Sequence, residues 1–189
     1  MLNLPGNNKK DSLRRLMLQR RDAISEDYMT IASKQIQKNL KKIGAYVEAG
    51  VIGAYYSVGS EVKTDRIIQE ALSFSKTVAL PRVEGGEMVF CSVDGFDNME
   101  KGEFGIMEPK QNRPKVEKFD VILVPAIAMT RDGQRLGYGM GYYDRFLSNT
   151  KAVTVALAYS KMVVKKIPVT GGDVPIQWIV TEDEVIKTS

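Results

Sequence analysis

The sequence predicts an α/β fold in which helices flank a mainly parallel sheet. Short apolar runs, such as residues 51–56 and 77–80, alternate with helix-like segments along the chain. This alternation is typical of parallel sheets covered by helices. A chain of 189 residues with 43% hydrophobic content can also bury one sizeable core. We therefore expect a single domain over residues 1–189, with residues 1–45 as an N-terminal helical arm packed on it.

The predicted arm contains two helices. Asp11 or Ser12 could cap the first, whose apolar residues recur at helical spacing as far as Ile24. Ser25 could cap the second. One face of this second helix would carry Tyr28, Ile31, Ala32, Ile36, Leu40 and Ile43.

A strand–helix–strand unit follows Gly50. Residues 51–56 indicate a buried strand, and residues 77–80 indicate the next one. Between them, Thr64 could cap a helix. The apolar residues of that helix would be Ile67, Ile68, Ala71 and Leu72.

The second half of the chain predicts more strands. They are expected at residues 88–91, 120–126, 152–158 and 178–180. Gly and Pro punctuate residues 95–114, which indicates a surface excursion. In open parallel sheets, ligands bind beyond the carboxyl ends of the strands. We therefore expect residues 57–64 and 130–144 to emerge around the functional site.

Composition narrows the available chemistry. The chain has no histidine, which excludes Ser-His and Cys-His nucleophile pairs and most zinc sites. The groups that remain for catalysis are carboxylates, lysines, tyrosines, backbone amides and a hard oxygen-bound cation. Phosphoryl transfer can be catalysed by such groups. The net charge of +4 favours anionic ligands, although dispersed surface lysines would give the same total.

Nothing in the sequence indicates a membrane or secretory segment. No apolar run approaches the roughly 20 residues that a membrane span needs. The start, Met1 to Gly6, has no apolar core of signal-peptide length. Cys91 is the only cysteine, so an internal disulfide is excluded. It lies in an apolar run. We expect a cytoplasmic protein with no membrane partner.

Residues 135–145 are the most informative segment. Glycines occupy every second position, at Gly137, Gly139 and Gly141, between an apolar run and a helix-like pattern. In a strand-to-helix turn, their free amides could hold a phosphate, and Asp144 could hold its metal. The spacing matches neither the Walker nor the dinucleotide motif. The alternative is a tight turn whose glycines merely adopt positive φ.

Four other polar residues are candidates for the site. Glu61 follows a predicted strand and could face the same cleft, or it could be a surface carboxylate. Lys10 and Arg14 lie one helical turn apart and could embrace a polyphosphate, or form a solvated face. Asp173 is a good turn former or a partner for metal or phosphate.

The chain resembles the 5-formyltetrahydrofolate cyclo-ligase family, also called methenyltetrahydrofolate synthetase. The resemblance runs over essentially the whole chain. It is carried by residues 10–14, 61–64, 105–109, 124–126, 133–145 and 173–182, together with Pro168. The glycine–tyrosine run at residues 133–145 is the most specific of these.

The resemblance implies a fold of the sugar-phosphate isomerase and CoA-transferase type. It also implies a ligase (EC 6.3.3.2) that uses ATP and Mg²⁺ to convert 5-formyltetrahydrofolate to 5,10-methenyltetrahydrofolate, releasing ADP and phosphate. The formyl oxygen would attack the γ-phosphate to give an iminium phosphate, and N10 would then close the ring. The implied partners are the folate and ATP, without nucleic acid, and we expect a monomer.

The resemblance also assigns roles to positions. The implied ATP-binding residues are Lys10, Asp11, Ser12, Leu13, Arg14, Arg135, Leu136, Gly137, Tyr138, Gly139, Met140, Gly141, Tyr142 and Tyr143. The implied folate-binding residues are Tyr56, Glu61, Tyr138, Gly139, Met140, Gly141 and Tyr142. Arg135, Asp144 and Arg145 are the catalytic candidates, and Asp144 and Asp173 are the metal candidates. An aromatic wall could stack on the pterin, and the Glu61 carboxylate could accept two of its N–H groups.

Three positions depart from the common family pattern, namely Met140, Gly172 and Gln177. They bear on folate specificity more than on ATP binding. Two alternatives remain open. One is a paralogue that keeps the ATP site and activates another formyl or amide compound. The other is a basic RNA-associated protein, which the dispersed lysines and the absence of an RNP-like motif disfavour.

Overall fold

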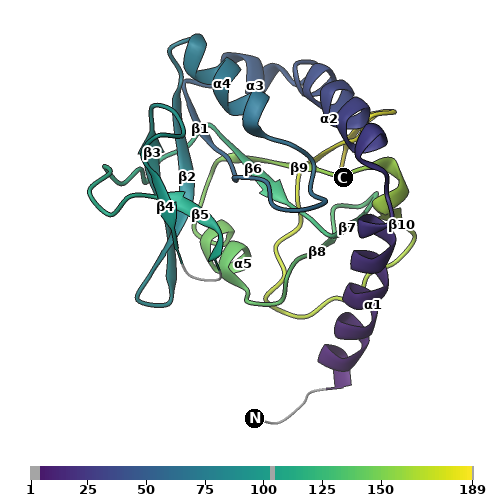
Figure 1. Ribbon diagram of the computed structural model, residues 1–189. Helices are drawn as coiled ribbons and strands as arrows, with labels where there is room; N and C mark the ends of the chain where they lie inside the picture. Colours follow the sequence, from purple (N-terminus) through teal and green to yellow (C-terminus); the bar gives the residue numbers. More distant parts are fainter. Residues whose placement is uncertain (1–4, 103–104, 189) are drawn as a thin grey trace.

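The computed structural model of this chain describes residues 5–102 and 105–188 (Figure 1). Residues 1–4 lie outside the described residues. They are the start of the predicted helical arm and of the segment 1–6 in which we found no signal-peptide core. The main sheet has the strand order β12-β11-β9-β6-β1-β2-β3. Its strands are β1 (Val51–Gly53), β2 (Thr77–Glu84), β3 (Glu87–Val93), β6 (Val121–Pro125), β9 (Val153–Leu157), β11 (Trp178–Val180) and β12 (Val185–Lys187).

The five inner strands are parallel, and an antiparallel strand closes each edge. β2, β1, β6, β9 and β11 pair in parallel, whereas β3 pairs antiparallel to β2 and β12 antiparallel to β11. All five residues of β6 are buried, as expected for a central strand with both faces covered. The predicted α/β fold with a mainly parallel sheet is therefore confirmed.

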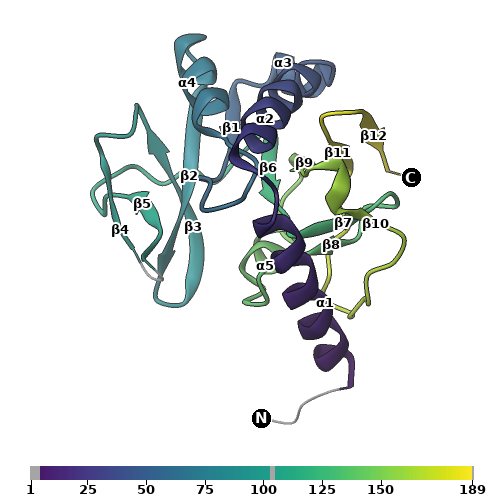
Figure 2. The same cartoon turned by 45° about the vertical axis from the view of Figure 1, so that its right-hand side comes forward.

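Helices pack on both faces of this sheet. They are α1 (Pro5–Asp22), α2 (Glu26–Leu40), α3 (Gly44–Glu48), α4 (Asp65–Ser73), α5 (Tyr142–Leu147) and the 3₁₀ turn η2 (Ser160–Met162). Ile36 and Leu40 of α2 and Ile67 and Ile68 of α4 belong to one core cluster, whereas Leu147 of α5 belongs to the other. Figures 1 and 2 show α2, α3 and α4 grouped together and α5 apart from them.

Three details of the predicted arm are wrong, and one is confirmed. Asp11 and Ser12 do not cap the first helix, because α1 already begins at Pro5 and they lie inside it. Ser25 does cap α2, since its side chain accepts a hydrogen bond from the Tyr28 amide at 3.4 Å. Ile31 is 70% exposed and so is not on the buried face. Ile43 is buried but follows α2, where it precedes the short helix α3.

The strand predicted at residues 51–56 ends early, at Gly53. The chain then leaves the sheet, and the Tyr55 carbonyl accepts a hydrogen bond from the Thr64 hydroxyl at 2.6 Å instead of a ladder bond. Thr64 precedes α4 as predicted, although its side chain makes no capping bond to that helix. The hydroxyl is used to close the 57–64 loop, which is the loop expected at the site.

Two small sheets were not predicted. The excursion at residues 95–114 contains the hairpin β4 (Met99–Lys101) and β5 (Met107–Pro109), and residues 103–104 lie outside the described residues. A second sheet has the order β10-β7-β8, with β7 (Ala128–Thr130), β8 (Arg135–Leu136) and β10 (Val163–Val164). The glycine turn therefore follows β8 and not β6 directly, although it remains a strand-to-helix turn.

Among the described residues, no helix is long and apolar enough to cross a membrane. The division of the chain into one domain with an arm, the monomeric state and the cytoplasmic location stay predictions.

Asn39 joins α2 to the end of β11, and we expect its loss to destabilise the fold. Asn39 is 1% exposed, and its amide nitrogen donates to the carbonyls of Thr181 at 2.8 Å and Glu182 at 3.0 Å. Asn39→Ala should lower the free energy of unfolding by about 2 kcal/mol, because buried carbonyls lose their donor. Urea denaturation measures this, with the exposed neighbour Lys38→Ala as control. Equal effects of the two substitutions would contradict the role of Asn39.

Candidate functional site

A cleft of about 900 Å³ lies beyond the carboxyl ends of the central strands. One wall comes from the 57–64 loop, with Glu61, and from Tyr56 before it. The glycine turn, residues 135–145, contributes a second wall, and Lys10, Arg14 and Asp173 contribute a third. Segments that lie far apart in the sequence thus meet in one cavity. Of residues 10–14, Lys10 and Arg14 line the cleft, whereas Leu13 packs against the core.

The glycine turn is held against α1 by Arg14. The Arg14 Nε donates to the Gly137 carbonyl at 2.8 Å, and its guanidinium also pairs with Asp11. Gly139 has φ +101, and a Cβ atom there would lie 3.1 Å from the Arg14 Cζ. Both the conformation and the close approach therefore require glycine at this position. Asp11 serves as a partner of Arg14 and is not itself part of the cleft lining.

Arg135 and Asp144 form a second charged pair behind the turn. Arg135 Nη2 donates to Asp144 Oδ1 at 3.0 Å, and its Nη1 donates to the Pro125 carbonyl at 3.4 Å. The Arg135 side chain is 5% exposed and lies over the Tyr143 ring, with the Cζ atom 5.6 Å from its centroid. Within the described residues, Arg135 Nε and the Tyr143 hydroxyl are buried without a hydrogen-bond partner. Buried polar atoms of this kind next to a cleft are typical of a ligand site.

Lys10 and Asp173 form the third charged group. Lys10 Nζ lies 2.7 Å and 2.6 Å from the two carboxylate oxygens of Asp173. Thr170 donates to the same carboxylate through its amide at 2.7 Å. Burial opposes ionisation of Asp173, but the bonds from Lys10 and Thr170 outweigh it and lower the pKa of the carboxyl below its usual value. Asp173 is therefore an ionised carboxylate that is already paired with the Lys10 ammonium group.

Glu61 is a buried carboxylate at the opposite wall. It is 4% exposed, and its Oε1 accepts a hydrogen bond from the Tyr138 hydroxyl at 2.5 Å. Its Oε2 accepts from the Val58 amide at 2.8 Å. Burial, and then the charge of Glu61, raise the pKa of Tyr138, so this hydroxyl keeps its proton at neutral pH. The alternative of a surface carboxylate is wrong for Glu61.

The remaining wall of the cleft is mostly apolar and includes residues that the sequence did not indicate. Tyr56 packs edge-on against Phe96, with ring centroids 5.5 Å apart. Pro81, Val83, Met88, Ile106 and Met107 continue this wall. Glu108, which is 5% exposed, also lines the cleft. The segment 105–109 carried part of the family resemblance, but no residue in it was predicted to contact a ligand.

Arg21 is another residue that the sequence did not single out. It is 4% exposed and donates to the Tyr138 hydroxyl at 2.9 Å. One signal was present, because Arg14 and Arg21 are seven residues apart and share one helix face with the buried Met17. Arginines one or two helical turns apart usually form a solvated helix face. The spacing of Arg14 and Arg21 therefore did not indicate that Arg21 is buried at the site.

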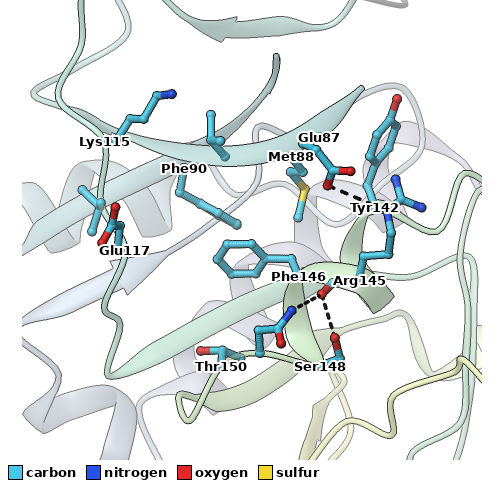
Figure 3. A pocket seen from close by; sticks show the side chains of 13 residues that line it. Glu87, Met88, Phe90, Lys115, Glu117, Tyr142, Arg145, Phe146, Ser148 and Thr150 are labelled. Carbon is cyan, nitrogen blue, oxygen red and sulfur yellow. Dashed lines mark hydrogen bonds and ion pairs between the residues drawn. The ribbon is translucent and has the colours of Figure 1, made fainter. Parts of the chain in front are cut away.

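A smaller cavity of about 520 Å³ lies between β3 and α5 (Figure 3). Phe90 and Phe146 lie against each other in its lining, with ring centroids 4.8 Å apart. Arg145 lies at the border with the main cleft, where its Nη1 donates to the Met140 carbonyl at 3.0 Å and its Nε lies 3.9 Å from Glu87. The predicted catalytic residue Arg145 therefore lines both cavities and is bonded to the glycine turn at Met140.

The fold and the cleft define a class of protein. An α/β sheet whose cleft sets a cation-rich glycine turn against a buried carboxylate is typical of an enzyme acting on an anionic small molecule. The model of the 5-formyltetrahydrofolate cyclo-ligase family matches residues 6–182. The chain belongs to this family, whose members are ATP-dependent ligases, and the prediction of a ligase of folate one-carbon metabolism is confirmed.

Individual relatives agree with the family match. The 5,10-methenyltetrahydrofolate synthetase of Aquifex aeolicus is 34% identical, has a TM-score of 0.84, and the match covers 94% of this chain and 92% of that one. The 5-formyltetrahydrofolate cyclo-ligase of Escherichia coli is 28% identical over 90% of this chain and 98% of its own. The eIF2B beta of Chaetomium thermophilum is 12% identical, with a TM-score of 0.51 over 85% of this chain and 54% of that one. This last likeness shows the sugar-isomerase-like fold alone.

Gly139→Ala should weaken ATP binding without unfolding the protein. A methyl group at φ +101 strains the backbone and meets the Arg14 guanidinium, so the turn and Arg14 must move apart. We expect the KM for ATP to rise about tenfold and the free energy of unfolding to fall by about 1–3 kcal/mol.

Gly171→Ala is the matched control, because a Cβ atom there meets nothing within 4 Å. Steady-state kinetics at saturating folate, with thermal unfolding of both variants, make the comparison. An unchanged KM for ATP in Gly139→Ala would show that the turn does not contact the nucleotide.

Proposed function

We propose that this chain cyclises 5-formyltetrahydrofolate to 5,10-methenyltetrahydrofolate, with ATP converted to ADP and phosphate. One observation supports this above all. The hydrogen bond of 2.5 Å between the Tyr138 hydroxyl and Glu61 joins the glycine turn to the carboxylate of the opposite wall. A phosphate held by the turn and a pterin held by Glu61 would therefore be neighbours in one cleft, as a transfer between them requires.

The nucleotide would lie along the glycine turn. Its phosphates would be met by the backbone amides of residues 137–141 and by Lys10, Arg14 and Arg135, which all line the cleft. Arg135 has a buried Nε without a partner among the described residues, so a phosphate oxygen could satisfy it. Arginine donors in a fixed fork also suit the planar spread of phosphate oxygens.

The folate would lie against Glu61 and the apolar wall. Each oxygen of the Glu61 carboxylate accepts a hydrogen bond from the described residues and can accept another, which suits the two N–H groups of a pterin edge. Tyr56, Met107 and Val83 supply apolar and aromatic surface for the flat ring. Met140, which is 54% exposed at the cleft, would contact the substrate through its side chain.

The reaction requires the protein to align the formyl oxygen with the γ-phosphate and to neutralise the phosphate charge. The formyl oxygen forms a bond to the γ-phosphorus while the bond from that phosphorus to the β,γ-bridging oxygen breaks, which releases ADP. N10 then attacks the activated carbon and gives up its proton to solvent, and phosphate leaves with the former formyl oxygen. Because phosphate is a good leaving group and an amide oxygen is a poor one, alignment by the two walls supplies much of the rate.

Asp144 and Asp173 are the residues that would hold Mg²⁺, and Asp173 would have to exchange its bonds from Lys10 for the cation. The donor set fits, because Mg²⁺ in proteins is commonly bound by one or two carboxylates together with substrate phosphates. Among the described residues, no group of three or more acidic, histidine or cysteine side chains could form a complete cage. The hydrogen bonds of Asp144 within the described part of the chain fall on Oδ1, so Oδ2 is available to a ligand. When bound, the cation would neutralise phosphate charge.

A direct assay tests the proposed function. Purified protein is incubated with 5-formyltetrahydrofolate, ATP and Mg²⁺, and the methenyl chromophore is followed by absorbance. Each component is then omitted in turn. Formation of the chromophore only in the complete mixture supports the cyclo-ligase. Turnover of ATP with another formyl compound, and none with this folate, would favour the paralogue.

Glu61→Gln should weaken folate binding far more than ATP binding. The amide keeps the size of the side chain but replaces one acceptor oxygen with a donor, which faces the N–H groups of the pterin. We expect the KM for 5-formyltetrahydrofolate to rise about a hundredfold. The KM for ATP, measured in the same preparation, is the internal control. Equal losses for both substrates would argue against a pterin anchor.

Asp144→Asn should remove Mg²⁺-dependent turnover while the fold is kept. Asparagine retains an oxygen that can accept the Arg135 bond but carries no charge for a cation. We expect the rate to fall by about 10²–10³, as when a charge-stabilising group of an active site is lost. Rates are measured across a Mg²⁺ titration, with circular dichroism to confirm folding. Wild-type turnover at all Mg²⁺ concentrations would remove Asp144 from the metal site.

A further inference from the structure

Arg21 is a buried cation to which no role has been assigned. It lies one residue before the end of α1, is 4% exposed, and all three nitrogens of its guanidinium donate hydrogen bonds. Nε donates to the Ser60 hydroxyl at 3.0 Å, Nη1 to the Ala126 carbonyl at 3.3 Å, and Nη2 to the Tyr138 hydroxyl at 2.9 Å. A buried charge is costly, so its retention here calls for a specific set of partners.

Its three partners belong to three different segments around the cleft. Ser60 precedes Glu61 in the 57–64 loop, Ala126 follows β6, and Tyr138 lies in the glycine turn. Arg21 therefore links the loop that carries the proposed pterin anchor to the turn that would hold the nucleotide. Figures 1 and 2 both show α1 running past β7 and β8, from which the glycine turn leaves.

The chemistry of arginine fixes the direction of the hydrogen bonds. A guanidinium has donors and no acceptor, so the Tyr138 oxygen must accept from Arg21. The single hydroxyl proton of Tyr138 must then point to its other neighbour, Glu61 Oε1, at 2.5 Å. Without Arg21, this hydroxyl could rotate, or accept a bond from a substrate N–H group in place of Glu61.

We propose that Arg21 is a positioning residue for the folate. By accepting from Arg21, Tyr138 is held as a donor to Glu61, and the carboxylate keeps one free acceptor site on each oxygen at the angle that a pterin edge needs. Arg21 itself does not touch the substrate. This proposal rests on the proposed function, because it gives Glu61 the role of pterin anchor.

Two substitutions test the assignment. Arg21→Gln removes the cation, and Tyr138→Phe removes only the hydroxyl between Arg21 and Glu61. Each should raise the KM for 5-formyltetrahydrofolate about ten- to hundredfold, the range expected for a hydrogen bond to a charged group. The KM for ATP should change less than about threefold. Arg21→Lys keeps the positive charge but has fewer hydrogen-bond donors. Its KM for 5-formyltetrahydrofolate should therefore lie between those of the wild type and Arg21→Gln.

The double variant separates positioning from general damage. If both residues act through one hydroxyl, Arg21→Gln combined with Tyr138→Phe should cost little more than the worse single variant. Arg20→Gln, at the exposed neighbouring position, is the control and should behave as wild type. Thermal unfolding of each variant monitors the fold.

Two results would overturn the role of Arg21. One is a double variant whose loss equals the product of the two single losses. The other is an equal rise of both KM values, which is what a merely structural arginine would give. A wild-type protein without turnover of 5-formyltetrahydrofolate would instead overturn the proposed function, so the two failures can be told apart.

Discussion

The cleft depends on the hydrogen bond between the Tyr138 hydroxyl and the Glu61 carboxylate. This bond of 2.5 Å joins residues that are 77 positions apart in the sequence. The sheet makes the contact possible, because β1 and β6 are adjacent parallel strands whose carboxyl ends face the same edge. The 57–64 loop leaves from the β1 side, and the glycine turn returns from β6 through the β7–β8 hairpin. Two loops of different origin are thus brought to one point.

Buried and half-buried charges around this point are paired in the free protein. Arg21 is linked to Glu61 through Tyr138, Arg135 pairs with Asp144, and Lys10 pairs with Asp173. An unpaired buried charge would be strongly destabilising, whereas a paired and hydrogen-bonded one is tolerated. The pairs also hold their side chains in place before any ligand arrives.

The sequence predicted the regular parts of the fold and missed the short ones. Buried parallel strands such as β6 and β9 are apolar runs, broken only by Thr154 in β9, so their pattern is clear. β8 has two residues, Arg135 and Leu136, which is too short for any periodicity, and the hairpin that presents the glycine turn was missed for that reason. Arg21 escaped notice because burial of an arginine depends on tertiary partners, none of which is near it in sequence. The roles of the predicted site residues remain predictions, although the cleft brings most of them together.

The alternation of the three glycines has a physical explanation that the sequence alone did not reveal. A Cβ atom at Gly137 would lie 2.6 Å from Arg135 Nη1, at Gly139 3.1 Å from Arg14 Cζ, and at Gly141 3.0 Å from Arg145 Nη1. Each glycine therefore leaves room for one guanidinium against the backbone. The tight-turn alternative explains positive φ but not three arginines in contact with one short turn. Because exposed amides and guanidinium groups both favour negative charge, this arrangement supports the proposal that the turn binds a phosphate.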